Sequence, residues 1–177
     1  MQPTEPFEVV TLPNPILRQT SREVSLAEIQ TGQVAFTNHK GKQKVMKLEE
    51  LVRRMKMTMY HKKGVGLAAP QAGIPLRVIV VDPTGDPSML SGPSQFKAII
   101  NPAIEVLVAL KMREHEGCLS VPGRHDEVER YMKIRVNGLN IKGEPLSFEA
   151  EGWEARVYQH EVDHLSGKLF IDHVKEK

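Results

Sequence analysis

The strongest constraint on the fold is one unbroken helical segment near the end of the chain, WEARVYQHEVDHL at 153–165. It contains no proline or glycine, and Gly167 follows it closely, so the pattern predicts a helix that ends there. Apolar and histidine side chains fall on two of its faces, and a helix of that kind is a buried one. These residues are Val157, His160 and His164 on one face and Ala155, Tyr158, Val162 and Leu165 on the other.

Within this helix the sequence has the pattern H-E-x-x-H. His160 and His164 are four residues apart, so their imidazoles lie one turn from each other on the same side. Two such imidazoles can bind a metal ion, and Glu161 between them can act on a water held by that metal. Burying these three side chains without a partner would be costly. The buried helix therefore favours a metal site over a chance pattern.

A catalytic metal usually has three protein ligands and one open position, so a third ligand is needed. A thiolate is a strong ligand for a borderline or soft divalent metal, and Gly117 before Cys118 lets the backbone come close. We therefore predict that Cys118 joins His160 and His164 as a metal ligand. The candidates for the third ligand are Cys118, which is the only cysteine and lies upstream of the helix, and Asp172, His173 and Glu176, which lie beyond it.

Helical and turn signals divide the first part of the chain. Ser25 and Glu28 have the spacing of a capping box, which predicts a short helix. Residues 31–44 are polar with two glycines and predict an exposed loop or an insertion. Apolar residues recur at helical spacing from Leu48 to Met59, which predicts an amphipathic helix that ends near Gly64. The glycine-rich GVGLAAPQAG at 64–73 predicts a loop after it.

The middle of the chain predicts strands. The run LRVIVVD at 76–82 is typical of a buried strand. Asn101-Pro102 predicts a turn between the apolar runs 96–100 and 103–110. The runs 131–140 and 144–150 flank Lys142-Gly143 and predict a hairpin. Strands followed by a helix, without regular alternation, indicate an α+β fold.

Composition limits the remaining possibilities. A chain of 177 residues fits a single domain, 1–177. A net charge of +2 gives no reason to expect a nucleic-acid partner, and one cysteine forms no intrachain disulfide. No apolar run reaches membrane-spanning length, and the first residues do not have the pattern of a targeting peptide. We expect a cytoplasmic protein without membrane contact.

Three segments resemble the signature motifs of peptide deformylases: GVGLAAPQ at 64–71, EGCLS at 116–120 and QHEVDHLSG at 159–167. The resemblance extends through INP at 100–102 and GWEAR at 152–156 and covers nearly the whole chain except 31–44. It implies an α+β fold in which antiparallel strands pack around the metal-binding helix. It implies removal of the formyl group from the formyl-methionine of newly synthesised polypeptides, which releases formate. It also implies one divalent metal, Fe²⁺ in the cell, with Zn²⁺, Ni²⁺ or Co²⁺ able to substitute.

The resemblance also implies roles for individual residues. Glu161 acts as general base and then as general acid, while the Gln71 side-chain amide and the Leu119 backbone N–H stabilise the tetrahedral oxyanion. Glu116 and Arg130 form an ion pair that braces the Cys118 turn. Gly66 allows the substrate to approach the backbone. The residues implied for the substrate site are Val65, Gly66, Gly117, Trp153 and Val157.

Two features depart from the family pattern. Glu114 stands where many relatives have an apolar or aromatic residue, and Arg124 with His125 occupies the stretch where relatives often have one substrate-contacting arginine. Two other functions compete with deformylation: an H-E-x-x-H metallopeptidase, and a binding module with a structural metal in which Glu161 has no task. The basic residues that are either a ribosome-facing patch or a solvated face are Lys40, Lys42, Lys44, Lys47, Arg53 and Arg54.

Overall fold

The structure, a computed structural model, describes residues 5–85 and 95–174. Three α-helices and seven strands are present in these residues, and 3-10 turns lie at Pro15–Arg18, Ala69–Ala72 and Phe170–His173. The helices are α1 (Leu26–Thr31), α2 (Leu48–His61) and α3 (Gly152–Leu165). The strands are β1 (Gln33–Thr37), β2 (Gln43–Lys47), β3 (Gly66–Ala68), β4 (Val78–Val81), β5 (Lys97–Cys118), β6 (Val121–Leu139) and β7 (Pro145–Glu151).

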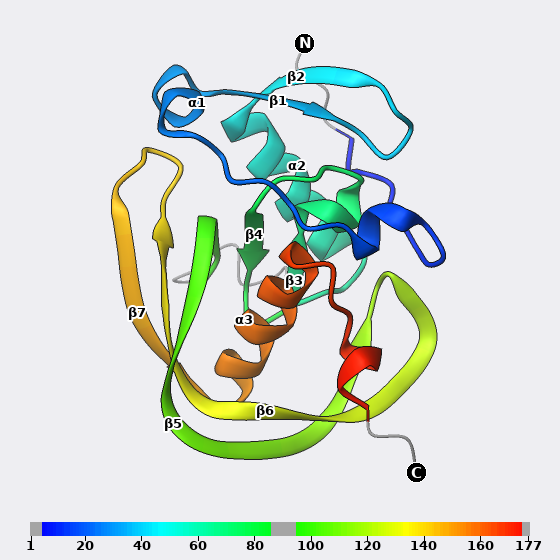
Figure 1. Ribbon diagram of the computed structural model, residues 1–177, viewed down its shortest axis with the longest axis vertical. Coiled ribbons are helices and arrows are strands. Elements are labelled where there is room, and N and C mark those ends of the chain that lie inside the picture. Colours follow the sequence, from blue (N-terminus) through cyan, green and yellow to red (C-terminus); the bar gives the residue numbers. More distant parts are fainter. Residues whose placement is uncertain (1–4, 86–94, 175–177) are drawn as a thin grey trace.

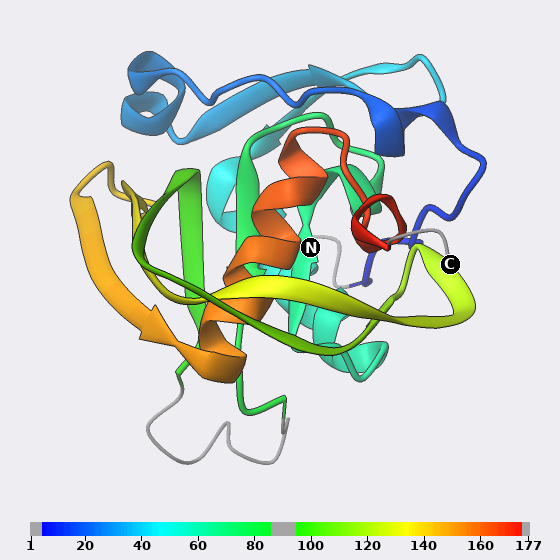
Figure 2. The ribbon, with the colours of Figure 1, turned by 60° about the horizontal axis from the view of Figure 1, so that its bottom comes forward.

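The strands form two antiparallel sheets. One is the β1–β2 hairpin, and the other has five strands in the order β3-β4-β5-β6-β7. Figures 1 and 2 show the long β5–β6 pair curving around α3, with β5 ending beside that helix. The α+β class and the antiparallel strands around a buried helix are thus confirmed. None of the described helices has the length and apolar character needed to cross a membrane.

Strand β4 separates two apolar clusters, which explains its continuous VIVV run. Val78 and Val80 pack into the cluster that includes α2 and the β1–β2 hairpin, while Ile79 and Val81 pack into the cluster around α3. All four side chains are fully buried. Successive side chains of a strand point to opposite faces, so a strand buried on both faces needs an apolar residue at every position. The predicted buried strand is confirmed.

The predicted exposed loop at 31–44 is wrong. Half of this segment belongs to β1 and β2, which pair from Gln33 opposite Lys47 to Thr37 opposite Gln43. Val34 and Phe36 are buried in the α2 cluster, and the alternate residues of β1 are exposed. The alternation of buried and exposed residues is short, and the polar turn between the strands dominates the composition of the segment. The sequence therefore predicted a loop and not two strands. Asn38 closes the turn by accepting hydrogen bonds from the backbone N–H groups of Lys40 and Lys42.

Asn101-Pro102 does not make the predicted turn either, because β5 continues through it with a shift of register against β6. Asn101 adopts a positive φ of 51°. Its side chain bonds both backbone groups of Val24, at 2.9 Å and 2.8 Å, and its N–H donates to the Arg77 carbonyl. These distant partners hold Asn101 in a bulge, and local sequence does not contain them.

The remaining predictions for single elements agree with the structure. The Ser25–Glu28 capping box is formed at the start of α1, and α2 is amphipathic. The β6–β7 hairpin closes around Lys142 and Gly143. The glycine-rich segment at 64–73 is more ordered than predicted, because it contains β3, which pairs with β4, and a 3-10 turn. The ordering matters because this segment borders the candidate site.

Candidate metal centre and active site

Cys118, His160 and His164 come together around one point. Cys118 is the last residue of β5, and the two histidines lie on α3. One potential ligand atom from each of the three residues lies within 4.8 Å of the others, and Cys118 Sγ is 3.3 Å from His164 Nε2. The H-E-x-x-H spacing puts both imidazoles on one side of α3, and the sheet brings the thiol to that side. The arrangement has the donor set and the size of a divalent metal site.

Glu116 orients one of the two imidazoles. His160 Nδ1 lies 2.9 Å from Glu116 Oε2, which leaves His160 Nε2 to face the Cys118 thiol side of the site. Arg130 donates two hydrogen bonds to the same carboxylate, at 2.9 Å and 3.0 Å. Burial opposes ionisation of Glu116, but these contacts outweigh it and hold the pKa of the carboxyl well below its ordinary range. Partners of this kind fix the ring orientation of a metal-binding histidine.

A second arginine completes this network, and sequence reasoning missed it. Arg156 is buried and donates to Glu116 Oε1 at 2.7 Å and to the carbonyls of Val128 and Met112. It lies four residues before His160, one turn away on the same face of a buried helix. That position was a usable signal, because a buried arginine needs acceptors.

Asp163 extends the network on the opposite side and was also missed. It accepts from Arg130 Nη1 at 2.5 Å and lies 2.7 Å from His173 Nε2. The sequence around Asp163 does not indicate its partners, because Arg130 comes from β6 and His173 from the final 3-10 turn. The network therefore joins β5, β6 and α3 directly beneath the metal centre.

Glu161 is buried at 4% exposure next to the metal ligands, and its Oε2 has no hydrogen-bond partner among the described residues. Burial raises the pKa of Glu161 to about 7. Its carboxylate lies against the backbone of Gly66, where a Cβ would come within 2.4 Å of Glu161 Oε1. The close approach at Gly66 is therefore made by Glu161, whereas we expected it from the substrate. A buried, unpartnered carboxylate with a pKa near neutrality is suited to proton transfer.

Gln71 points into the site from the 3-10 turn after β3. Its Oε1 accepts from the Ala68 N–H at 2.9 Å, which orients the amide so that Nε2 lies 3.4 Å from Cys118 Sγ and 3.3 Å from Ser120 Oγ. The N-terminal segment holds the two loops together. Val10 N–H donates to the Gln71 carbonyl at 2.8 Å, and Leu12 N–H donates to the Ser120 carbonyl at 3.0 Å.

A pocket of about 450 Å³ opens over these groups. Cys118, His160 and Glu161 line the pocket, and so does Leu119. All five residues implied for the substrate site also belong to its walls. Trp153 forms one wall with 49% of its surface exposed, and its indole N–H donates to the Pro83 carbonyl at 3.1 Å. The substrate-site residues in the walls are Val65, Gly66, Gly117, Trp153 and Val157.

The electrostatics of the three ligand residues suit a cation. Burial opposes the charged form of His160, but its contacts with Cys118 and Glu116 raise its pKa to about 10. Burial and the positive charge of His160 lower the pKa of His164 well below its ordinary value. The centre thus favours a proton on His160, and with it one positive charge, next to the Cys118 thiol. A divalent cation would take the place of this proton.

The other candidates for a third ligand lie elsewhere. His173 pairs with Asp163, while Asp172 accepts from Arg18 at 2.5 Å and from the Leu169 N–H at 2.8 Å. Glu176 is outside the described residues. In the described part of the chain, Cys118 is the third group that meets His160 and His164.

Comparison with known proteins agrees with this geometry. The protein-family model described as polypeptide deformylase matches residues 6–177. The chain belongs to the peptide deformylase family. The peptide deformylase of Desulforudis audaxviator is 41% identical over 167 residues, which cover 94% of this chain and 92% of that protein. The peptide deformylase of Bartonella tribocorum is 42% identical over 168 residues, 94% of this chain and 83% of that protein.

Solved deformylase structures share the fold. The crystal structure of peptide deformylase from Thermotoga maritima has a TM-score of 0.79 and 35% identity, covering 97% of this chain and 99% of that chain. The Met-Ala-Ser-bound structure of a class I type b peptide deformylase from Acinetobacter baumannii has a TM-score of 0.78 and 32% identity, covering 97% and 100%. The protein is accordingly a metal-dependent hydrolase of the peptide deformylase type, which removes N-terminal formyl groups from nascent peptides.

Proposed function

We propose that Cys118, His160 and His164 bind one divalent metal ion, Fe²⁺ in the cell, and that Zn²⁺, Ni²⁺ or Co²⁺ can substitute. The observation that carries the proposal is the convergence of one thiol and two imidazoles within 4.8 Å, beside the buried Glu161 carboxylate. One thiolate with two imidazoles suits borderline divalent metals better than Mg²⁺ or Ca²⁺. When bound, the metal supplies the Lewis acid that activates water and polarises the formyl carbonyl.

We assign the proton transfers to Glu161. Its Oε2, which has no partner among the described residues, takes a proton from the attacking water and returns it to the amine that leaves. The pKa of about 7 supports both roles, because the group can accept and release a proton near neutral pH. Gln71 Nε2 donates to the oxyanion that develops on the formyl oxygen, and we assign the second donor to the Leu119 backbone N–H. Each donor of this type contributes about 3 kcal/mol to lowering a barrier.

We infer that the pocket receives formyl-methionine. Val65, Trp153 and Val157 give it apolar walls for the methionine side chain. The related enzyme from Acinetobacter baumannii has been solved with Met-Ala-Ser bound, a peptide that begins with methionine. A formyl carbon carries only hydrogen, so narrow walls at the centre would exclude an acetyl group. Glu116 and Arg130 act through His160 and Cys118 as positioning residues.

We further propose that residues 1–177 act as a single catalytic domain in the cytoplasm. The family match over 6–177 supports one domain. Because the substrates are newly synthesised chains, we propose that the enzyme meets them at the ribosome surface. No specific contact with nucleic acid or membrane is part of this proposal.

The test is formate release from formyl-Met-Ala-Ser by protein purified without oxygen and loaded with Fe²⁺. We expect release that a chelator abolishes and that does not occur with acetyl-Met-Ala-Ser. Glu161→Gln should keep the metal and the fold and lose about 10²- to 10⁴-fold in kcat, because it lacks the proton acceptor. Full activity of that variant would overturn the role of Glu161. A folded, metal-loaded protein that releases no formate would overturn the proposed function.

A further inference from the structure

The exposed ionisable side chains at the mouth of the pocket are all of basic residue types. Among the residues that line it, every exposed ionisable side chain is basic; we call these four residues the basic rim. The two acidic residues of the lining, Glu116 and Glu161, are buried at 6% and 4% exposure and belong to the centre below. The basic rim consists of Lys63, His115, Arg124 and His125.

Neighbouring acids compensate only half of the basic rim. Arg124 Nε lies 2.6 Å from Asp126 Oδ2, and His115 Nε2 lies 4.0 Å from Glu127 Oε1. Lys63 and His125 have no acidic partner within 4.0 Å in residues 5–85 and 95–174. The Lys63 ammonium charge and the hydrogen-bonding groups of both side chains are therefore open to a ligand.

Local structure holds both side chains at the pocket. Lys63 lies in the turn that ends α2, with a φ of 56° and its N–H bonded to the Tyr60 carbonyl. His125 packs over Gly117, where a Cβ would come within 2.6 Å of the His125 ring. Lys63 follows α2, and His125 lies on β6, so the two side chains reach the pocket from different elements.

The direction of the substrate links the basic rim to specificity, and this step rests on the proposed function. The formyl end must reach Glu161 and the metal ligands, which lie at the buried end of the pocket. The chain after methionine then leaves through the exposed end. At about 3.3 Å per extended residue, the next two or three side chains pass the basic rim.

We propose that the basic rim selects nascent chains that carry an acidic side chain in the first residues after formyl-methionine. A carboxylate about 6 Å from the Lys63 ammonium in water gains roughly threefold in binding, and a substrate lysine loses a similar factor. The effect belongs to binding and not to the chemical step, so it changes KM and leaves kcat nearly constant.

The experiment compares three substrates, formyl-Met-Ala-Asp-amide, formyl-Met-Ala-Asn-amide and formyl-Met-Ala-Lys-amide. The amide removes the terminal carboxylate, and asparagine is a neutral match for aspartate in size. We expect kcat/KM to fall roughly tenfold from Asp to Lys, with Asn between them. In about 1 M salt the three values should converge, because exposed charges are screened.

Two variants assign the effect to the basic rim. Lys63→Glu should invert the order, so that the Lys peptide becomes the better substrate. Lys62→Glu is the matched control, because it changes the charge equally at an adjacent exposed residue that does not line the pocket, and it should keep the original order. Equal kcat/KM for the three peptides, or an unchanged order in Lys63→Glu, would overturn the proposal.

Peptide binding tests the basic rim without turnover. Trp153 is the only tryptophan and lines the pocket, so its fluorescence reports binding of the deformylated peptides Met-Ala-Asp-amide and Met-Ala-Lys-amide. A lower Kd for the Asp peptide supports the proposed selectivity of the basic rim, whether or not formate is released in the activity assay. Absence of formate release would overturn only the proposed function. Equal Kd values would overturn the basic rim alone.

Discussion

Glu161 depends on the missing side chain at Gly66. A Cβ on Gly66 would lie 2.4 Å from Glu161 Oε1, 2.7 Å from Cδ and 2.8 Å from Cγ, so the whole carboxyl group rests on the glycine. Such contacts are shorter than packed atoms allow. The glycine therefore makes room for the proposed proton acceptor, and a substitution there would reach catalysis through Glu161.

We predict that Gly66→Ala lowers kcat by about a hundredfold, because the added methyl group displaces the Glu161 carboxylate from its position. The three atoms nearest to this methyl group all belong to Glu161, so metal content measured by elemental analysis should stay at one ion per chain. Steady-state kinetics with formyl-Met-Ala-Ser measures the loss. A variant with normal kcat would show that Glu161 tolerates displacement or has another role.

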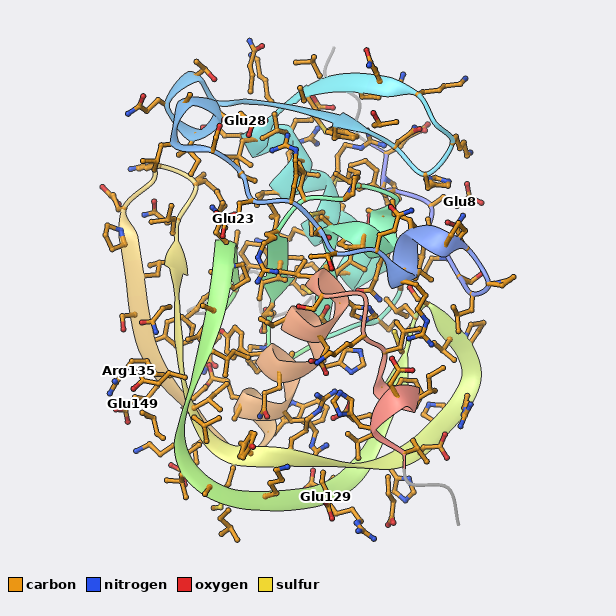
Figure 3. All side chains as sticks on the ribbon, in the orientation of Figure 1. Glu8, Glu23, Glu28, Glu129, Arg135 and Glu149 are labelled. Atoms are coloured by element: carbon orange, nitrogen blue, oxygen red, sulfur yellow. The ribbon has the colours of Figure 1, made fainter. Side chains whose placement is uncertain are left out.

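At the scale of elements, a buried arginine connects α3 with β5 and β6 next to the candidate metal centre. Arg156 on α3 bonds the Glu116 carboxylate on β5 and the Val128 carbonyl on β6, and it is 3% exposed. In contrast, Arg135 and Glu149 point outward from β6 and β7 (Figure 3) and lie 3.0 Å apart. Both arginines bond carboxylates, but Arg156 does so in the interior and Arg135 does so at the surface.

We predict that Arg156→Met lowers the free energy of unfolding by about 3 kcal/mol, because it leaves part of the buried Glu116 charge and two carbonyls without a donor. The matched control, Arg135→Met, removes an arginine that pairs with Glu105 and Glu149 at the surface. Its effect should stay below about 1 kcal/mol. Urea unfolding of both variants measures the difference, and equal losses would contradict the argument.

An ion pair at the start of α1 holds a carboxylate with a lowered pKa. The hydrogen bonds from Arg22 lower the pKa of Glu28 from 4.5 to about 2. Arg22 Nη2 lies 2.7 Å from Glu28 Oε1, and Glu28 also accepts from the Ser25 and Ala35 N–H groups. One carboxylate thus joins α1, β1 and the segment before them. Because the folded pKa is depressed, its stabilisation is present above pH 4.5 and is lost as the pH falls towards 2.

We predict that Glu28→Gln is less stable than the wild type at pH 7 and that the difference shrinks between pH 4.5 and pH 2. Unfolding by urea at pH 7, 4 and 2.5 measures it. Glu23→Gln is a control close by (Figure 3), because the Glu23 side chain is exposed and makes no ion pair in the described residues. A pH-independent difference for Glu28→Gln would mean that Glu28 acts through its shape alone.

At the scale of the whole molecule, the candidate metal centre joins parts of the chain that are distant in sequence. Cys118 closes β5, while His160 and His164 belong to α3. A metal bound there links the sheet to the helix that fills its curve (Figure 2). Because a ligand that binds only the folded state stabilises that state, metal affinity becomes folding stability.

We predict that removing the metal by chelation lowers the Tm and that adding Fe²⁺ or Zn²⁺ restores it. At a metal concentration a hundredfold above Kd the gain is about 2.7 kcal/mol, or roughly 5–10 °C for a domain of this size. Scanning calorimetry measures the shift. Cys118→Ala should have a low Tm that does not respond to chelation, and a normal metal response in this variant would remove Cys118 from the ligand set.

The sequence by itself determined the features that depend on neighbours along the chain. The spacing of His160 and His164, the capping box at Ser25 and the apolar run of β4 each follow from one helical turn or one strand period. Combined with the three family motifs, they were enough for the α+β class and the activity. Cys118 could be proposed as a ligand because its chemistry, and not its position, singled it out.

Tertiary structure alone decided the contacts between distant residues. The bulge at Asn101 depends on Val24, the burial of Phe36 depends on α2, and the Glu116 carboxylate is bonded by Arg156 from α3. It also decided that Gly66 makes room for Glu161. Local patterns hold no information about such partners, because these contacts exist only after the whole chain has folded and brought these residues together.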